Sequence, residues 1–266
     1  MATHQNWRGM PAFTRAIVRP PGPTFAKGLT SAGKGAPDLS SALAQHSAYR
    51  DALRRCGVDV IELPTSDAFP DATFVEDVAV IVDGHPMLTR PGAPSRRDEV
   101  GLIRDKVAAL FPRYEAIAAP GTLDGGDVCE AGDRCFVGIS DRTNEAGADQ
   151  FGRWLGSLGR RLVKVDIRSI RGLLHLKSAM AFVDGVFIVA PVARALPALS
   201  GEPSIYVKDD DTYAANCVEI NGRVLVAAGF PRLTAELKER GLDVIELDMS
   251  EFEKMDGGLS CLSLRF

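Results

Sequence analysis

The 266-residue sequence is poor in the residues from which many metal and dinucleotide sites are built. It has only four histidines, and its five cysteines include no CxxC pair. It contains no HExxH motif and no GxGxxG motif followed by an acidic residue. We therefore expect neither a metal ion nor an organic cofactor.

Long apolar stretches are also missing. No stretch approaches the roughly 20 apolar residues of a membrane span. Arginines interrupt residues 1–20, where a signal peptide needs an apolar core. The scattered, odd-numbered cysteines are typical of free thiols in a reducing compartment. We therefore expect a cytoplasmic protein with no membrane partner, and partial disorder in residues 1–10.

Positive charge is not in excess. The 31 Lys and Arg residues stand against 35 Asp and Glu residues, for a net charge of −4, so nucleic acid is not an expected partner. Local carboxylates can still bind a small cation. With 45% hydrophobic and 25% charged residues and no linker-like segment, the composition predicts a single globular domain spanning residues 1–266.

What the sequence does contain is an internal repeat. Segments 54–63 and 239–247 share a glycine that can end a helix, followed at once by an alternating strand, and segment 156–165 is a looser copy. Downstream of each copy, apolar strands flank a tight turn. These turns are Asp83-Gly84, Gly132-Asp133, Asp184-Gly185 and Asn221-Gly222.

The repeat predicts an architecture. A helix plus a small sheet, repeated about five times, favours a closed, propeller-like α/β ring. The C-terminal strand at 259–266 would pair with the N-terminal strand at 13–19 and close it. A doubly wound α/β sheet is the alternative, which hairpins within the units do not favour.

The segment 28–35 nearly matches a phosphate-binding P-loop. It has the GxxxxGK pattern, but Gly35 stands where a Mg²⁺-binding Ser or Thr is needed. The Pro-rich segment before it does not predict a buried strand. We interpret these residues as a surface loop and leave a gating role open.

Polar side chains stand beside the apolar strands at one register of the repeat. Taken singly, most such residues cap turns or pack in a core. Related by pseudo-rotation, they would meet at one end of the ring axis, where the paired glycines at 257 and 258 would let the backbone approach a ligand. The set comprises Asp71, Glu76, Asp77, Asp124, Asp127, His175, Asn216 and Cys261.

These residue types suit one kind of reaction. Several carboxylates attract a cation, and a planar guanidinium matches paired carboxylates. A thiolate of Cys261 can attack the guanidinium carbon, while His175 can protonate the departing amine and later deprotonate water. Arg90 and Arg142 can hold a substrate carboxylate.

The same residues carry a resemblance to a known family. Six segments, at 74–77, 89–93, 142–144, 174–177, 213–217 and 257–261, resemble those of dimethylarginine dimethylaminohydrolases, which belong to the guanidine-modifying superfamily. The resemblance runs in unbroken order from about residue 28 to the C-terminus. It implies a five-bladed α/β propeller, the pentein fold, in agreement with the repeat.

The resemblance also implies an active site. Cys261 would be the nucleophile, His175 the general acid and base, and Asp124 the carboxylate that assists them. The segment at 28–35 would be the family's mobile lid. The implied substrate-binding residues are Leu29, Asp71, Glu76, Asp77, Arg90, Arg142, Met255 and Asp256.

The implied reaction converts an Nω-methylated arginine to citrulline and methylamine or dimethylamine, through a thiouronium intermediate on Cys261 and without a cofactor. The implied partner is a small guanidinium amino acid, and a homodimer is a possible assembly. The alternative is the same chemistry on arginine, as in arginine deiminases, or on another alkylated guanidine. A catalytically silent protein that binds cationic amino acids is the alternative from another class, and Cys261 and His175 argue against it.

Overall fold

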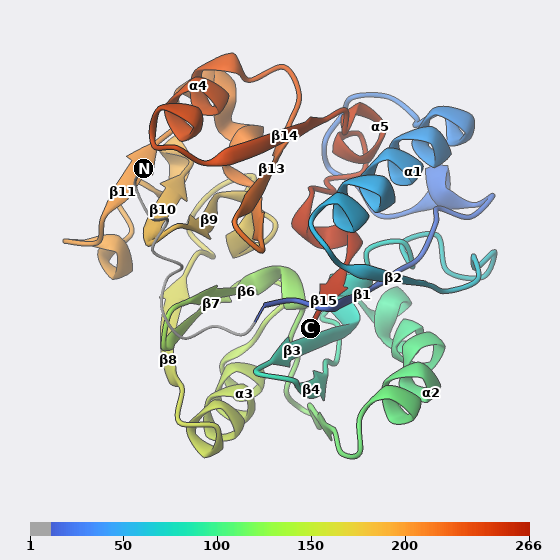
Figure 1. Ribbon diagram of the computed structural model, residues 1–266. Helices are drawn as coiled ribbons and strands as arrows, with labels where there is room; N and C mark the ends of the chain where they lie inside the picture. Colours follow the sequence, from blue (N-terminus) through green and yellow to red (C-terminus); the bar gives the residue numbers. More distant parts are fainter. Residues whose placement is uncertain (1–11) are drawn as a thin grey trace.

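Five small sheets surround a common axis in the computed structural model, which describes residues 12–266. Figure 1 looks along this axis and shows the sheets side by side around it. In each sheet the middle strand pairs antiparallel with one neighbour and parallel with the other. The prediction of a closed α/β ring of repeated modules is confirmed, and the doubly wound alternative is wrong.

The strands of each sheet follow one another along the chain, except in the sheet that joins the two ends. In spatial order the sheets are β15 (Leu264–Arg265), β1 (Arg15–Val18) and β2 (Asp59–Glu62); β3 (Ala79–Val82), β4 (His85–Leu88) and β5 (Glu115–Ala116); β6 (Val128–Ala131), β7 (Arg134–Ile139) and β8 (Arg161–Asp166); β9 (Met180–Val183), β10 (Val186–Val189) and β11 (Ser204–Tyr206); and β12 (Val218–Ile220), β13 (Arg223–Ala227) and β14 (Asp243–Leu247).

Four of the five parallel connections contain an α-helix on the outside of the ring (Figure 1). These helices are α1 (Leu39–Arg55), α2 (Gly101–Leu110), α3 (Glu145–Ser157) and α4 (Pro231–Glu239), while the short α5 (Ser250–Glu253) follows β14. The expectation of a helix in every module is wrong for the connection from β10 to β11. There two 3₁₀ turns, each begun by a proline, take its place: Pro191–Ala193 and Pro197–Leu199.

The predicted hairpin turns are all present. Asp83, Asp184 and Asn221 have φ of 50°, 46° and 52°, and each precedes a glycine of positive φ, as type I′ turns require. At Gly132-Asp133 only the glycine has positive φ, which fits a type II′ turn. The turns fix the register of each antiparallel pair.

The two ends of the chain close the ring as predicted. β15 pairs antiparallel with β1, with Ile17 opposite Leu264 and Ala16 opposite Arg265. Leu264 and Ile17 are buried. The fifth sheet therefore depends on residues almost 250 positions apart.

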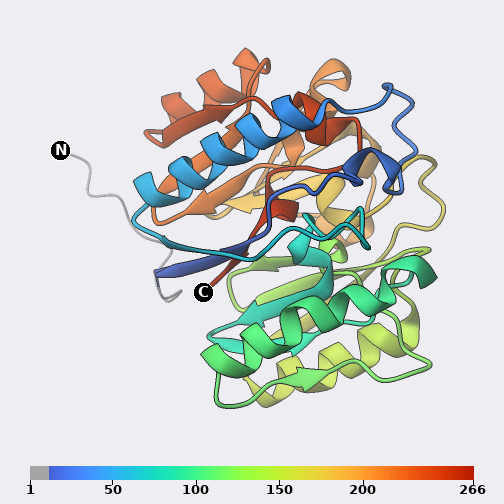
Figure 2. The ribbon, with the colours of Figure 1, turned by 90° about the vertical axis from the view of Figure 1, so that its right-hand side faces the viewer.

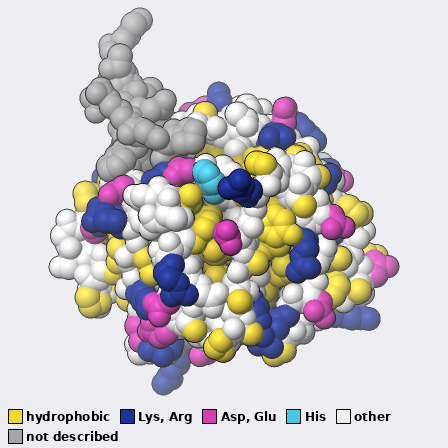
Figure 3. Space-filling view, turned by 90° about the horizontal axis from the view of Figure 1, so that it is seen from below, with side chains coloured by type: hydrophobic (Ala, Val, Ile, Leu, Met, Phe, Trp, Pro, Cys, Tyr) yellow, Lys and Arg dark blue, Asp and Glu magenta, His cyan; other side chains and the backbone are white. Residues whose placement is uncertain are grey.

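Apolar side chains pack between the sheets and the outer helices. In the third module, for example, Phe151 and Leu155 of α3 pack with Val137 of β7. Among the described residues, no helix combines the length and apolar character that crossing a membrane requires. On the face shown in Figure 3, positive and negative side chains are interspersed among hydrophobic ones.

The ring has two distinct ends. Seen edge-on in Figure 2, the start of β1 and the C-terminus lie on one side, and the loop before α1 lies on the other. The prediction of disorder in residues 1–10 lies outside the described residues.

Candidate active site

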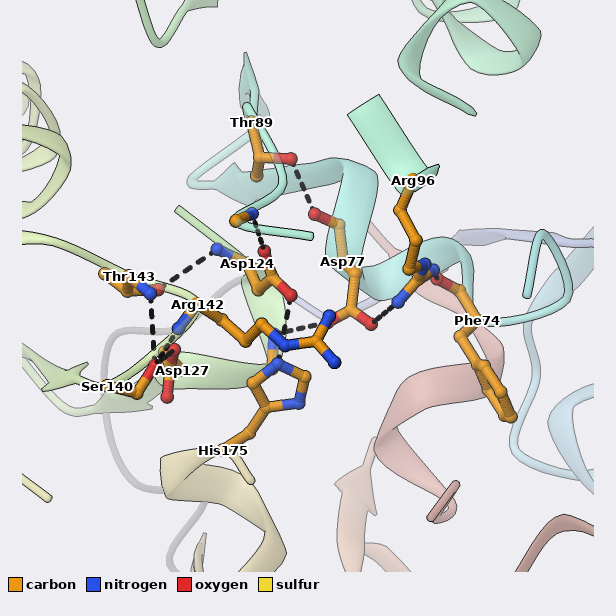
Figure 4. A network of polar contacts seen from close by, with 12 residues as sticks. Phe74, Asp77, Thr89, Arg96, Asp124, Asp127, Ser140, Arg142, Thr143 and His175 are labelled. Carbon is orange, nitrogen blue, oxygen red and sulfur yellow. Dashed lines mark hydrogen bonds and ion pairs between the residues drawn. The ribbon is translucent and has the colours of Figure 1, made fainter. Parts of the chain in front are cut away.

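Short 3₁₀ turns before the first strand of each hairpin carry the polar side chains to the axis. Asp77 lies in the turn before β3, Asp124 and Asp127 begin and end the turn before β6, and His175 caps the turn before β9. The turn before β6 contacts each of the other two, and Figure 4 shows the four side chains together. Cys261 lies in the equivalent turn before β15. Of the predicted set, Asp71, Asp77, His175 and Cys261 line one cavity, whereas Glu76 and Asn216 are not part of its described lining.

His175 is held by a buried carboxylate. Its Nε2 lies 3.1 Å from Oδ2 of Asp124, which is fully buried. The other oxygen of Asp124 accepts the Gly92 N–H at 2.8 Å. Because both carboxylate oxygens have partners, Asp124 fixes the plane of the imidazole.

The carboxylates around His175 keep it protonated. Burial alone would lower its pKa, but Asp77, Asp124 and Asp127 outweigh burial and raise the pKa to about 9. At neutral pH the ring is therefore an imidazolium, the form that can give a proton to a leaving amine.

Asp77 is kept ionised by His175 and by an arginine absent from the predicted site. Its Oδ2 lies 2.5 Å from a terminal nitrogen of Arg96, and its Oδ1 accepts the Gly126 N–H at 2.9 Å. Burial would raise the pKa of Asp77, but His175 and Arg96 lower it to about 2. Arg96 also pairs with Glu99, and this three-residue spacing was its signal in the sequence, although nothing there showed that the pair is buried.

Most of the predicted site residues line one small cavity of about 30 Å³. Phe74, Arg96, Leu174 and Gly257 complete the lining. The predicted residues among the lining are Leu29, Asp71, Asp77, Arg142, His175, Met255, Asp256 and Cys261.

Cys261 is a thiol in this environment. Burial, together with the negative charges of Glu76 and Asp77, raises its pKa to about 12. Its Sγ accepts a hydrogen bond from the Gly258 N–H at 3.4 Å. A bound cation next to the sulfur would oppose these carboxylates and favour the thiolate.

The paired glycines let other parts of the protein approach closely, and Gly257 also lines the cavity, where the expected approach of a ligand stays a prediction. A Cβ at Gly258 would lie 2.5 Å from the side chain of Asn216. A Cβ at Gly257 would overlap the ring of Phe74. The close approach at both positions is therefore to the protein itself.

Two predicted binding residues do not belong to the described lining of this cavity. Glu76 forms an ion pair with Lys177 and accepts a hydrogen bond from Ser260 Oγ at 2.9 Å. Lys177 and Ser260 line a second cavity of about 410 Å³, at the end of the ring where the hairpin turns lie. Arg90 donates to the Gly121 carbonyl oxygen at 3.2 Å.

The near-P-loop segment covers the cavity as an exposed loop, as predicted. Asp71 accepts the Leu29 N–H at 3.0 Å, and Asp256 accepts the Ser31 N–H at 2.5 Å. The Nζ of Lys34 lies 2.5 Å from Glu253. A cavity of 30 Å³ holds about one or two water molecules, so an amino acid can enter only if this loop moves.

The carboxylate cluster is also the one place among residues 12–266 where three potential metal ligands converge. Donor atoms of Asp77, Asp124 and His175 lie within 4.8 Å of one another. However, Arg96 and the Gly92 and Gly126 N–H groups already bond these carboxylates. These carboxylates therefore already bind a guanidinium and backbone N–H groups. The chemistry proposed below uses no metal.

Comparison with known proteins identifies the family. The family model of eukaryotic N,N dimethylarginine dimethylhydrolases matches residues 34–193. The chain belongs to the dimethylarginine dimethylaminohydrolase family. It is 39% identical to the N(G),N(G)-dimethylarginine dimethylaminohydrolase of Pseudomonas aeruginosa over 96% of this chain and all of that protein. It is 37% identical to the enzyme of the same name from Streptomyces coelicolor, covering 94% and 96% of the two chains.

Solved structures agree with this assignment. A Cys-to-Ser mutant of the Pseudomonas aeruginosa protein complexed with citrulline superposes with a TM-score of 0.92 at 39% identity, covering 96% of this chain and 100% of that one. The structure of a dimethylarginine dimethylaminohydrolase adduct with S-methyl-L-thiocitrulline superposes with a TM-score of 0.91, at the same identity and coverage. The N-terminal domain of a cyanobacterial arginine dihydrolase shares the fold, with a TM-score of 0.84 at 19% identity over 96% and 97% of the chains.

Proposed function

We propose that this protein hydrolyses asymmetric dimethylarginine and monomethylarginine to citrulline and dimethylamine or methylamine. The observation that carries the proposal is the meeting of a protonated His175, its partner Asp124 and the Cys261 thiol around one carboxylate-rich cavity. Family membership and the ligands of the related structures point to the same substrate class.

In this proposal the substrate is held at both ends. Asp71, Asp77 and Asp256 attract the guanidinium, and Arg142 receives the α-carboxylate, because it is an arginine at the edge of the same cavity. Leu29 and Met255 contribute backbone contacts. Burial raises the pKa of Asp71, so a bound guanidinium also stabilises its ionised form.

Glu76 and Arg90 take indirect parts. Both are buried or half-buried beside lining residues but are absent from the described lining. We propose that Glu76 acts on the site through its negative charge near Cys261. Arg90 would support the turn that carries Gly92, and would turn toward the α-carboxylate only after the loop moves.

Covalent attack is the first chemical step. Binding of the cationic guanidinium lowers the pKa of Cys261, and its proton leaves to solvent. The sulfur lone pair forms a bond to the central guanidinium carbon and gives a tetrahedral adduct. His175 then donates its proton to the methylated nitrogen, and the C–N bond breaks as the amine departs.

Hydrolysis completes the cycle. The neutral His175 accepts a proton from water, and the water oxygen bonds to the carbon of the thiouronium intermediate. The C–S bond breaks, the electron pair returns to sulfur, and citrulline is released. Asp124 holds the ring in place through both proton transfers.

The experiment that tests this proposal compares substrates. The purified protein is incubated separately with asymmetric dimethylarginine, monomethylarginine and arginine, and citrulline and the amine are both quantified. We expect equal amounts of citrulline and methylated amine and far slower turnover of arginine. Turnover of arginine alone would instead assign the chain to the deiminase reaction. Absence of turnover with all three compounds would refute the proposal.

Three further expectations remain predictions. A single domain predicts one cooperative unfolding transition. A cytoplasmic location predicts that the five cysteines stay reduced in the cell, and all five are free thiols in the structure. A homodimer predicts twice the 28.5 kDa chain mass in sedimentation.

A further inference from the structure

A buried amide joins the two loops that carry the nucleophile and the acid. Asn216 ends the 3₁₀ turn before β12, and its side chain is buried. Its Oδ1 accepts the Ser260 N–H at 3.0 Å, and its Nδ2 donates to the Lys177 carbonyl oxygen at 2.9 Å. Ser260 directly precedes Cys261, and Lys177 follows His175 by two residues. One side chain thus bonds both catalytic loops.

The bonding pattern requires an amide. A backbone N–H needs an acceptor and a backbone carbonyl needs a donor, so Oδ1 and Nδ2 of Asn216 cannot exchange places. Nδ2 also lies 3.1 Å from Ser260 Oγ, which in turn donates to Glu76 at 2.9 Å. An aspartate of the same shape would keep the bond from Ser260 N–H and lose the donor to Lys177.

Asn216 also supports the backbone that contacts the sulfur. A Cβ at Gly258 would lie only 2.5 Å from the Asn216 side chain, so the two are in tight contact. The Gly258 N–H is the donor to Cys261 Sγ. A shift of Asn216 is therefore transmitted to the sulfur through Gly258 and Ser260 together, and to the histidine loop through Lys177.

We propose that Asn216 is a positioning residue that sets the geometry between Cys261 and His175. It touches neither substrate nor reacting atoms in this account. The inference rests on the proposed function, since it assigns those two residues to nucleophile and acid. A misplacement of reacting groups by about 1 Å costs on the order of 10²-fold in rate.

The test compares two variants of Asn216 with a matched control. Asn216→Ala removes all three hydrogen bonds, and Asn216→Asp keeps the shape and removes the donor. Asn221→Ala also removes three hydrogen bonds, to Phe13 and Cys56, but at the β12–β13 turn. Circular dichroism below the melting temperature verifies folding of each variant before kinetics.

We expect kcat to fall about 10- to 100-fold in Asn216→Ala, with KM within about twofold of the parent, because geometry rather than binding is lost. The kcat of Asn216→Asp should also be lower than that of the parent. Asn221→Ala should lose stability and keep kcat. A merely structural Asn216 would lower the melting temperature and leave kcat of the folded protein unchanged.

A second readout needs no substrate. The alkylation rate of Cys261 by iodoacetamide, followed by mass spectrometry of its peptide, should change near pH 9, where His175 loses its proton. His175 and Cys261 line the same cavity, and in both Asn216 variants the change in alkylation rate should shrink on the order of twofold or more, because the distance between the imidazolium and the sulfur is no longer fixed. If the parent protein does not turn over dimethylarginine, the proposed function fails, and the change in alkylation rate still decides the role of Asn216. An unchanged kcat in both variants would overturn the inference. If the parent protein shows no turnover, an unchanged step in the alkylation rate of Cys261 in both variants would overturn it.

Discussion

In the proposed mechanism, charge determines the protonation states in which His175 and Cys261 begin the reaction. Asp77, Asp124 and Asp127 raise the pKa of the imidazole to about 9, while burial together with Glu76 and Asp77 raises the pKa of the thiol to about 12. Both groups therefore carry their protons at neutral pH. A cationic substrate changes this balance, because its charge opposes the carboxylates next to the sulfur.

Replacing Asp124 tests how the acid is maintained. The pKa of His175 is raised in the folded protein, so its protonated form persists up to about pH 9, whereas an unperturbed histidine loses its proton near 6.5. Asp124→Asn removes one of the carboxylates responsible. We expect the basic limb of kcat/KM to move to lower pH and kcat to fall roughly 10²-fold.

The measurement is kcat/KM between pH 6 and 10, with the exposed Asp141→Asn as a control for loss of one negative charge. A basic limb that stays in place in Asp124→Asn would show that Asp124 does not hold the histidine proton.

Ionisation of Cys261 should depend on the substrate. We expect thiolate absorbance in the ultraviolet to increase when a non-reactive cationic analogue binds near neutral pH, because the analogue lowers the pKa of the sulfur from about 12. Subtraction of the Cys261→Ser spectrum removes the other four thiols, which are buried. An identical Cys261 pKa with and without the analogue would contradict substrate-dependent ionisation.

Arg142 and Arg90 should differ in effect. Arg142→Lys replaces a fork-shaped donor at the cavity with a point charge, and we expect KM to rise about tenfold with kcat little changed. An analogue without the α-carboxylate should show no such penalty. Arg90→Lys should raise KM less, because Arg90 donates its hydrogen bond to the Gly121 carbonyl oxygen of the protein. A larger effect at Arg90 would reverse these assignments.

Most of the polar residues proposed for the site were picked out because chemistry-bearing side chains share one register of the repeat, whereas Leu29, Met255 and Asp256 came only from the family resemblance. Their exact partners depended on tertiary structure. The burial of Arg96 against Asp77 could not be predicted, because an Arg–Glu spacing of three is equally typical of an exposed helix face. Similarly, the sequence of Gly257 and Gly258 does not reveal that the side chains of Phe74 and Asn216 approach them.

At the scale of elements, we propose that the loop between β1 and α1 controls access to the cavity. Its described bonds to Asp71, Asp256 and Glu253 hold it over a cavity that is too small for an amino acid. Opening breaks a few hydrogen bonds and one partly exposed ion pair. Such a loop can open without disturbing the sheets behind it.

Lys34→Gln tests this closure. The ion pair of Lys34 with Glu253 is half-exposed, so it stabilises the closed loop by only about 0.2–1 kcal/mol. We expect KM to rise by up to about fivefold, and the difference to disappear at high ionic strength as the pair is screened. Lys27→Gln, which has the same charge change and no ion pair among the described residues, should leave KM unchanged. A salt-independent effect, or none at all, would contradict a role for this pair in closure.

The elements themselves were largely readable from local signals. Turn residues predicted the hairpins, and the helix-ending glycines at 57, 159 and 241 predicted three of the four connecting helices. The helix expected between β10 and β11 failed because Pro191 and Pro197 divide a short connection, and each begins a 3₁₀ turn. A repeat inferred from its clearest copies overlooks such local exceptions.

At the scale of the whole molecule, closure of the ring brings the proposed nucleophile to the proposed acid. Cys261 lies just before β15, and pairing with β1 holds β15 in the ring. His175 belongs to another module. The closure could be predicted from the repeat count, whereas the register of Ile17 against Leu264 came from the structure.

Leu264→Ala tests the contribution of this closure to stability. Leu264 is buried between β1 and the second module, so we expect its truncation to lower the free energy of unfolding by about 2–5 kcal/mol. Leu43→Ala on α1, where the side chain is 41% exposed, should change it by about 0.5 kcal/mol or less. Urea unfolding measured by fluorescence and circular dichroism gives both values. Equal losses in the free energy of unfolding for the two variants would contradict a contribution of ring closure to stability.

The most direct test of the account is whether turnover passes through Cys261. Purified protein and its Cys261→Ser variant are incubated with asymmetric dimethylarginine and quenched with acid, after which citrulline and the mass of the Cys261 peptide are measured. We predict citrulline and a covalent adduct on that peptide in the parent protein, and neither in the variant. Citrulline release that persists in Cys261→Ser would contradict the central claim.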